Sequence, residues 1–414
     1  MQKYDVVVVG GGCGGLAVAG RIRRQRPEMT VAVIEPASDH YYQPAWTLVG
    51  AGAYSAEATR KAEASVMPKG VNWIKTRVTG FEPGSDIVAL EDDSRVEYRA
   101  LVAAAGIQLN WGAIEGLPDT LGRNGVTSNY DYKLAPYTWE CIRNYRGEGP
   151  ALFTQPPMPI KCPGAPQKIV YLAADRFRQR GLKADVQFFN AGPSMFGVPF
   201  FAKALEKVID SWGAKRNFGH NLVAVNGESK EATFEVTELE GKRRVTHKFE
   251  MLHVVPPQSA PDFIRNSPLA GDVGWVTVDK NTMRHTQFEN VFGLGDCTNT
   301  PNSKTAAAIK NQAPVVVANL LRALEGKGEE RRYDGYASCP LTTSLGKVML
   351  AEFCYDGVVT PSFFLDPRVP RKAFWWLKKS FLPQLYWNFI IPGRDWPIVH
   401  KKRDYAEAVP QFTP

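Results

Sequence analysis

Two of the six cysteines, Cys162 and Cys339, stand in sequence contexts that favour reactive thiols. Cys162 lies in the stretch IKCPGAPQK, which also holds Lys161 and Lys168, and Cys339 is followed by Pro340. A thiolate is the nucleophilic form of cysteine, and a neighbouring ammonium group lowers the pKa of a thiol. We therefore expect thiol chemistry at Cys162, assisted by Lys161 and Lys168, with Cys339 as a second candidate.

The cysteines indicate neither a zinc site nor a disulfide scaffold. They form no C-x-x-C pair, which is the spacing typical of structural zinc sites, and six in 414 residues are too few to cross-link a chain of this size. No metal site is expected, and any disulfide would be catalytic rather than structural. The other four are expected to pack as small side chains, with a secondary thiol role left open for the last: Cys13, Cys141, Cys297 and Cys354.

The N-terminal elements predict a dinucleotide site. Residues 4–9, YDVVVV, read as a buried parallel strand, GGGCGG follows, and residues 16–24 read as a helix. Gly10, Gly12 and Gly15 fit G-x-G-x-x-G, in which the glycines allow the tight turn, the approach of a pyrophosphate and close helix–strand packing. The next strand ends at Glu35, at the distance from the turn where a carboxylate can bind a ribose.

A second fingerprint lies far along the chain. Residues 286–296, TQFENVFGLGD, resemble the second motif of glutathione-reductase-like flavoproteins with two dinucleotide-binding domains, which implies that Asp296 bonds the ribityl chain of FAD. A predicted helix follows, with Ser303, Lys304 and Thr305 at its N-terminus. The partial positive charge there would stabilise an anionic reduced flavin.

The chain length and the order of elements predict three regions. Residues 1–112 and 276–330 are expected to form a split FAD-binding domain, and residues 113–275 a second Rossmann-like domain carrying Cys162. In this second domain the strand at 151–154 leads into QPPMPIKCPGAPQK rather than a glycine turn, which argues against tight NAD(P)H binding. The predicted fold is α/β, with two Rossmann-like (FAD/NAD(P)-type) domains and a C-terminal amphipathic membrane-binding region at 331–414.

The C-terminal region contains the stretch 371–396, RKAFWWLKKSFLPQLYWNFIIPGRDW, which is dense in aromatic residues and lysines. Its apolar pieces are too short to span a bilayer, and they suit two short helices lying in the membrane interface. The net charge of +8 suits anionic headgroups, and no basic run resembles a nucleic-acid surface. A dimer interface or core helices stay open as alternatives. The residues expected to face lipid or a quinone are Phe374, Trp375, Trp376, Phe381, Leu385, Tyr386, Trp387 and Phe389.

Several stretches together carry a family resemblance: HYYQPAWTLVGAGA, GIQLN, KCPGAPQK, EMLHVVPP, GDCTNTPNSKTAAA and YDGYASCPL. With them, most of residues 3–356 resembles the sulfide:quinone oxidoreductases, in particular the subgroup that includes the mitochondrial enzymes. The resemblance implies that Cys162 and Cys339 form a disulfide beside non-covalent FAD. HS⁻ would attack this disulfide at Cys339, leaving a persulfide there and a thiolate on Cys162, and the electrons would pass through FAD to a quinone.

The fingerprints and the resemblance together give the expected cofactor residues. They are Gly10, Gly12, Cys13, Gly14, Gly15, Glu35, Gln43, Val78, Gly106, Asp296, Lys304 and Thr305.

The resemblance also implies the partners: hydrogen sulfide, ubiquinone or menaquinone, membrane lipid, and a small sulfur acceptor such as a thiol, sulfite or sulfide. A homo-oligomer stays open. The first strand begins almost at the N-terminus with no leader before it, so we expect a peripheral, monotopic protein on a prokaryotic inner membrane rather than a mitochondrial one. The alternatives are a type II NADH:quinone oxidoreductase-like flavoprotein, a sulfide sensor or persulfide carrier without turnover, and a flavocytochrome-type sulfide dehydrogenase.

Overall fold

The computed structural model describes residues 1–238, 241–328, 330–395 and 399–412. Its first sheet has the order β5-β2-β1-β8-β7-β6, with β19 paired to β8. The strands β5, β2, β1, β8 and β19 are parallel, and Val6 to Val9 of β1 are almost fully buried, as expected for a strand covered on both faces. The strand bounds are β1 Gln2–Val9, β2 Val31–Ile34, β5 Val71–Ile74, β6 Val78–Glu82, β7 Ile87–Leu90, β8 Arg95–Ala103 and β19 Val291–Gly293.

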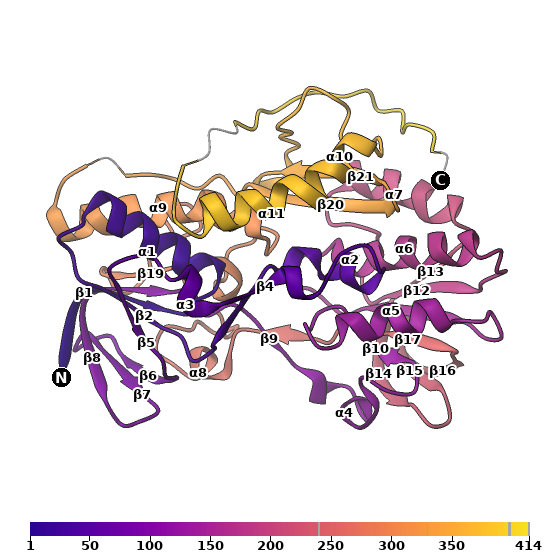
Figure 1. The fold of residues 1–414 in the computed structure, drawn as a ribbon, viewed down its shortest axis with the longest axis horizontal. Coiled ribbons are helices and arrows are strands. Elements are labelled where there is room, and N and C mark those ends of the chain that lie inside the picture. The colour runs from indigo at the N-terminus through magenta and orange to yellow at the C-terminus, as the bar shows by residue number, and fades with distance from the viewer. Residues whose placement is uncertain (239–240, 329, 396–398, 413–414) are drawn as a thin grey trace.

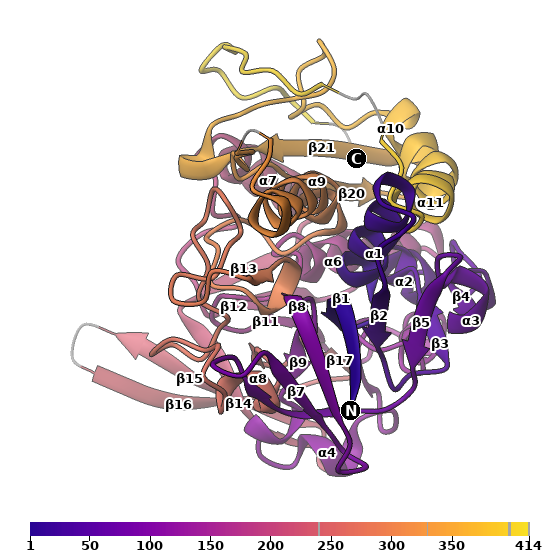
Figure 2. The same cartoon turned by 90° about the vertical axis from the view of Figure 1, so that its left-hand side faces the viewer.

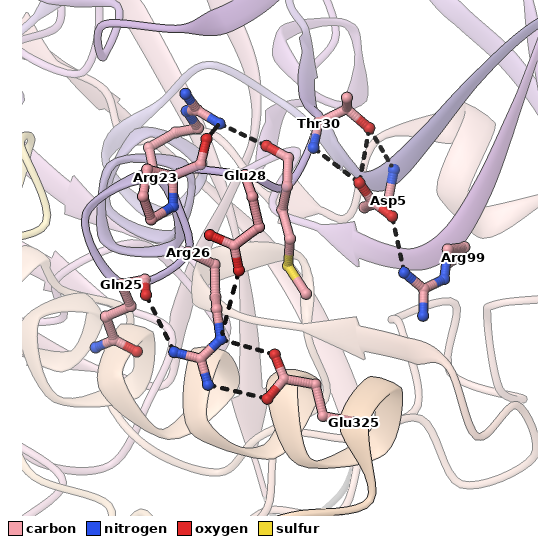
Figure 3. A network of polar contacts seen from close by, with 10 residues as sticks. Asp5, Arg23, Gln25, Arg26, Glu28, Thr30, Arg99 and Glu325 are labelled. Atoms are coloured by element: carbon pink, nitrogen blue, oxygen red, sulfur yellow. Dashed lines mark hydrogen bonds and ion pairs between the residues drawn. The ribbon is translucent and has the colours of Figure 1, made fainter.

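Two helices, α1 (Cys13–Gln25) and α9 (Ala306–Glu325), lie side by side over this sheet (Figure 1). Arg26, at the end of α1, donates two hydrogen bonds of 2.7 and 2.9 Å to the carboxylate of Glu325 at the end of α9 (Figure 3). Asp5 of β1 bonds Arg99 of β8 in the same region. These polar contacts hold together the ends of the elements that lie opposite the glycine turn.

The second sheet is entirely parallel and has the order β10-β17-β11-β12-β13. A separate antiparallel sheet of β14, β15 and β16 projects from it (Figure 2). The strands are β10 Val126–Thr127, β11 Ala151–Gln155, β12 Val186–Asn190, β13 Lys215–Phe218, β14 His220–Asn226, β15 Glu231–Glu238, β16 Gly241–Lys248 and β17 Met251–His253. The helices of this half are α5 Ala135–Asn144, α6 Ala165–Gln179 and α7 Pro199–Ser211.

The two sheets confirm the predicted α/β fold with two Rossmann-like halves. The first sheet takes its strands from residues 2–103 and 291–293, and the second from residues 126–253. The division at 112 and 276 stays our proposal, and the composition of the sheets supports it. The two chain crossings pair with each other through β9 (Gln108–Leu109) and β18 (Gln258–Ser259).

Short elements complete the two halves. They are β3 Asp39–Tyr41, η1 Gln43–Ala45, α2 Trp46–Gly50, η2 Glu57–Thr59, β4 Arg60–Ala62, α3 Glu63–Val66, η3 Trp111–Ala113, α4 Leu117–Thr120, α8 Asp262–Arg265, η4 Gly295–Cys297 and η5 Tyr355–Gly357.

The C-terminal region adds a hairpin of β20 (Ala337–Ser344) and β21 (Lys347–Phe353), followed by a helical run along one edge of the molecule (Figure 1). The run is continuous, so the expectation of two separate short helices was wrong. Pro383 has no N–H to donate to the preceding turn, and the wide π turn before it takes up this mismatch. The run consists of α10 Lys372–Trp376, the π turn η6 Leu377–Phe381, α11 Leu382–Leu385 and the π turn η7 Tyr386–Ile390.

Among the described residues, no helix has the length and apolar character needed to cross a bilayer. Trp396, the last residue of the aromatic stretch, lies outside the described residues.

Candidate active site

A cavity of about 430 Å³ lies where the two sheets meet the C-terminal helical run. Its walls come from the glycine turn after β1, the β2–α2 segment, the loop holding Cys162, the start of α9, the β20–β21 hairpin and the helical run. Segments from all three predicted regions therefore share one site.

The glycine turn fits a dinucleotide. Gly10 has a φ of +106°, and a Cβ on Gly15 would lie 1.8 Å from the carbonyl oxygen of Gly10, so both positions require glycine. A Cβ on Gly12 would instead meet nothing within 4 Å, which leaves open space beside the backbone. Gly12, Cys13 and Gly14 line the cavity, whereas Gly10 and Gly15 shape the turn behind it.

Glu35 lies beside this turn, as the sequence predicts. Its carboxylate accepts hydrogen bonds from the backbone N–H groups of Gly11 and Ala37, at 2.8 and 2.7 Å. Burial raises the pKa of Glu35, while these two bonds oppose the shift. Gln43 and Gly106 also line the cavity, but Val78, at the start of β6, is not among its lining residues.

The second fingerprint places Asp296, Lys304 and Thr305 on the opposite wall. Thr305 caps α9, which begins at Ala306 rather than at Ser303, by accepting a hydrogen bond from the Ala308 N–H. Lys304 is turned away from α9, since its Nζ donates to the Thr298 carbonyl at 2.8 Å. Burial raises the pKa of Asp296, and the charges of Lys304 and Lys161 counteract the rise.

Cys162 lines the cavity, and Cys339 is buried directly behind it. Their Sγ atoms lie 4.0 Å apart, and the structure describes both as free thiols. Cys162 has a φ of +82°, which non-glycine residues rarely adopt. Cys339 is fully buried within β20, opposite Ala351 of β21, rather than in a loop. A strand thus holds one sulfur, while a strained turn holds the other against it.

Positive charge surrounds the Cys162 sulfur. Lys168 Nζ donates to it at 3.3 Å from the first turn of α6. The hydrogen bond from Cys339 lowers the pKa of Cys162 well below its usual range, helped by the charges of Lys168 and Lys378, while burial opposes the shift. The pKa of Cys339 is raised for the complementary reason, because its thiol donates to Cys162. Cys162 is therefore the more acidic thiol of the pair.

Lys378 is a site residue that the sequence interpretation missed. It was read as an interruption of the membrane-binding stretch, yet it is buried, it lines the cavity, and its Nζ donates to the Pro340 carbonyl at 3.2 Å. Burial, with a smaller contribution from the charge of Lys168, lowers its pKa to about 7. The signal was its spacing, because Phe374, Lys378 and Leu385 share one helical face and all three are buried.

Lys161 does not approach the Cys162 sulfur through a hydrogen bond. Its Nζ donates to Gln43 Oε1 at 2.9 Å and to the Tyr130 carbonyl at 3.4 Å. Burial lowers its pKa to about 8, although Asp296 counteracts this shift. Lys161 therefore belongs to the wall near Asp296, and Lys168 is the lysine on the thiol.

Tyr386 was expected to face lipid or a quinone, but it is buried inside the site. Its hydroxyl donates to His40 Nε2 at 2.7 Å, and the Nδ1–H of His40 is shared by the Gly11 carbonyl and Glu63 at 3.1 and 3.2 Å. This chain of bonds connects the glycine turn to the helical run. The sequence showed His40 only as a histidine near the cofactor motifs.

The other residues of the run that were expected to face lipid or a quinone differ in exposure. Phe374 and Leu385 are buried, Trp375, Phe381, Trp387 and Phe389 are half-buried, and Trp376 is 62% exposed. The loop before the run adds Phe363 and Phe364, at 37% and 78% exposed. We call Phe363, Phe364 and Trp376 the aromatic patch.

Comparison with known proteins places this site in a class. The pyridine nucleotide-disulphide oxidoreductase family matches residues 4–137, which contain the glycine turn. The fold and the site thus define an oxidoreductase of that class. The chain is 43% identical over 393 residues to the mitochondrial sulfide:quinone oxidoreductase of Dictyostelium discoideum, covering 94% of this chain and 86% of that protein. For the mouse protein of the same name the identity is 41% over 394 residues, with 95% and 87% covered.

The chain belongs to the sulfide:quinone oxidoreductase family. The solved structure of the sulfide:quinone oxidoreductase from Aquifex aeolicus has the same fold, with a TM-score of 0.77 at 20% identity, covering 95% of this chain and 92% of that one. The Dictyostelium and mouse relatives are both named mitochondrial, so the preference for a prokaryotic membrane is not supported.

Proposed function

We propose that this protein oxidises hydrogen sulfide at Cys162 and Cys339 and delivers two electrons through FAD to a membrane quinone. The observation that carries this proposal is the cysteine pair itself: Cys162 lines, with Lys168 and Lys378, the cavity that also holds a dinucleotide turn, and Cys339 lies 4.0 Å behind it. The family name of the relatives supports the same substrates.

The proposed reaction starts from the oxidised pair. HS⁻ attacks Sγ of Cys339, the disulfide breaks, and the products are a persulfide on Cys339 and a thiolate on Cys162. The positions of the lysines favour this direction, because Lys168 Nζ lies 3.3 Å from the Cys162 sulfur and a nearby positive charge makes Cys162 the better leaving group. Lys168 and Lys378 stabilise the negative charge that the attack transfers to Cys162.

When bound, FAD supplies the two-electron acceptor that this chemistry requires. Gly12 would leave room for its pyrophosphate, Glu35 would bind the ribose, and Asp296 would bind the ribityl chain. The N-terminus of α9 would lie near the part of the flavin that gains negative charge on reduction. We propose that the cofactor is held non-covalently by these groups. The persulfide sulfur then leaves Cys339 for a small acceptor, such as a thiol, sulfite or sulfide. The disulfide between Cys162 and Cys339 is re-formed by a two-electron oxidation of the cysteine pair, for which FAD would be the acceptor.

The quinone would reach the cavity through the helical run. Leu377, Leu382 and Ile390 of the run and Phe363 of the aromatic patch line the cavity. Apolar side chains therefore continue from the exposed patch into the site, and such a surface suits a peripheral contact with lipid. Because the curated relatives are named mitochondrial, we propose the mitochondrial inner membrane.

The test is Cys162→Ser and Cys339→Ser, with Cys141→Ser as the matched control, since Cys141 is a buried cysteine that does not line the cavity. Bleaching of the flavin absorbance by sulfide is followed in a stopped-flow instrument. We expect each active-site variant to lose the fast bleaching and the control to keep it.

Unchanged bleaching in both active-site variants would refute the disulfide chemistry. Rapid bleaching by NADH, together with none by sulfide, would favour a type II NADH:quinone oxidoreductase-like activity instead.

A further inference from the structure

Three side chains that the sulfide chemistry does not use meet at one end of the β20–β21 hairpin: Asp334, Cys354 and His400. One potential ligand atom of each, a carboxylate oxygen, a thiol sulfur and an imidazole nitrogen, lies within 4.8 Å of the other two. Within the described parts of the chain, this is the one such group of three His, Cys, Asp or Glu residues. Zinc binds this mixture of oxygen, sulfur and nitrogen ligands.

The hairpin holds two of the three groups in place. Asp334 precedes β20 and Cys354 follows β21, and the antiparallel pairing brings both to the same end. The Tyr355 N–H donates to the Asp334 carbonyl at 3.0 Å, which closes this end. The Tyr336 N–H donates to Asp334 Oδ1 at 3.0 Å, so that Oδ2 points to the third group.

His400 comes from the C-terminal tail, which crosses back over the hairpin. Its Nε2 lies 2.8 Å from Asp334 Oδ2, and its ring stacks on Tyr336 with the centroids 4.1 Å apart at 23°. The next residue, Lys401, donates its N–H to the Pro361 carbonyl at 3.4 Å. The imidazole is thus held by a ring on one side and a carboxylate on the other.

We propose that Asp334, Cys354 and His400 bind one Zn²⁺ ion. On binding, the Cys354 thiol loses its proton to solvent, neutral His400 offers Nε2, and both replace their present hydrogen bonds by bonds to the ion. Zinc–ligand bonds of about 2.0–2.3 Å would place the ligand atoms roughly 3.3–3.8 Å from one another, so movements of about 1 Å suffice. Asp334 is exposed, which leaves the fourth position to water.

The consequence is a staple between the tail and the strand that carries Cys339. No metal site was expected from the sequence, because that expectation rested on the absence of closely spaced cysteines. Here the ligands come from three segments far apart in the chain, and only the hairpin and the returning tail bring them together. The site shares no residue with the proposed sulfide chemistry, so either proposal can fail without the other.

The experiment uses the full-length, flavin-loaded protein with Cys162 and Cys339 both changed to serine, because two neighbouring thiols would themselves take up zinc. Zinc alone is titrated against a chromophoric chelator, and Co²⁺ is used as a spectroscopic substitute. The variants in this background are Cys354→Ser, His400→Ala and Asp334→Asn. The matched controls are Cys141→Ser and His220→Ala, and flavin absorbance per chain reports folding.

We expect one equivalent of zinc in the background protein, with affinity reduced about tenfold or more in each ligand variant and unchanged in the controls. Bound Co²⁺ should give a thiolate charge-transfer band that Cys354→Ser removes. Zinc should also slow tryptic cleavage after Lys401 in the background protein but not in His400→Ala. No zinc binding, or equal affinity and an equal cobalt band in the Cys354 variant, would overturn the proposal. If Cys354→Ser lacks flavin, the same criteria apply to Asp334→Asn and His400→Ala.

Discussion

Cys162 occupies a backbone conformation that costs free energy to maintain. A non-glycine residue at positive φ costs about 1–3 kcal/mol, and such strain persists where the surroundings impose it. Here the Ala165 N–H bonds the Cys162 carbonyl at 2.6 Å and Lys168 bonds its sulfur, so both ends of the residue are held. This conformation holds the Cys162 sulfur 4.0 Å from that of Cys339.

The charge on Lys168 should set the acidity of this thiol. In Lys168→Met, the pKa of Cys162 should rise by about one unit or more, because an ammonium group in direct contact with the thiolate is removed. The pH dependence of alkylation in the reduced protein measures this pKa. Lys161→Met is the control and should leave it within a few tenths of a unit; an equal rise in both variants would contradict the assignment of Lys168 to the sulfur.

Lys378 should add a pH dependence of its own. Its pKa of about 7 means that its charge is present below that pH and is lost as the pH rises through it. Flavin reduction per HS⁻ should therefore fall as the pH rises through about 7 in the wild type. Lys378→Arg stays charged and should remove this fall, whereas Lys378→Met should be slow throughout. An identical profile in the arginine variant would exclude Lys378 as the titrating group.

The C-terminal helical run has one buried face and one exposed face. Phe374, Lys378 and Leu385 are buried in the protein, whereas Trp376 is exposed, and the run thus extends from the aromatic patch to the site. Its π turns rotate the faces relative to an ideal α-helix. Tyr386, expected from the sequence to face lipid or a quinone, lines the cavity and reaches His40.

The contact between Tyr386 and His40 should stabilise the run against the glycine turn. Tyr386→Phe removes one buried hydrogen bond and should lower the free energy of unfolding by about 1 kcal/mol or more, since a buried imidazole nitrogen loses its partner. Chemical denaturation of the flavin-loaded protein measures this change. Tyr4→Phe, whose hydroxyl bonds Gln2 at the surface, is the control and should have little effect; equal losses would argue against a special role for the contact.

The aromatic patch should govern membrane binding but not sulfide chemistry. Trp376→Ser and Phe364→Ser remove exposed apolar area, and each should weaken binding to vesicles by up to about 2 kcal/mol if the ring is buried in lipid. Sedimentation with vesicles containing anionic lipid measures the binding, and flavin bleaching by sulfide should keep its wild-type rate. Unchanged sedimentation of the double variant would place the membrane contact elsewhere.

For the whole molecule, the two Rossmann-like halves were predictable because local patterns encode them. The run YDVVVV, the glycine turn and Glu35 lie within one short segment, and each imposes its structure on its neighbours. Cys162 and Cys339 could be recognised by their surrounding motifs. Lys378, the His40–Tyr386 contact and the departure of Lys161 from the sulfur could not, because they depend on how distant segments pack. The C-terminal region was the hardest to predict, because residue type alone does not distinguish its buried aromatic side chains from its exposed ones.

The open space at Gly12 gives a test of whether the cofactor binds at the glycine turn. In Gly12→Val, the new side chain should enter space that the protein leaves empty, so the chain should fold while flavin content falls about tenfold or more. The loss should lower the thermal midpoint, because a ligand that binds the native state stabilises it. Gly84→Val, at another glycine with no atoms near its Cβ position, is the control. Full flavin content in the Gly12 variant would show that the cofactor does not bind at this turn.

The small β9–β18 pairing has a mechanical consequence. It joins the only two places where the backbone passes between the halves in residues 104–275, and the Asn110 amide adds a bond of 3.1 Å to Ser259. Two strands tied side by side resist twisting far more than two independent linkers. The two halves should therefore move as one rigid body, without a hinge motion that opens and closes the space between them. Small reactants would then enter and leave through movements of individual side chains, while the backbones of the two halves keep their relative positions.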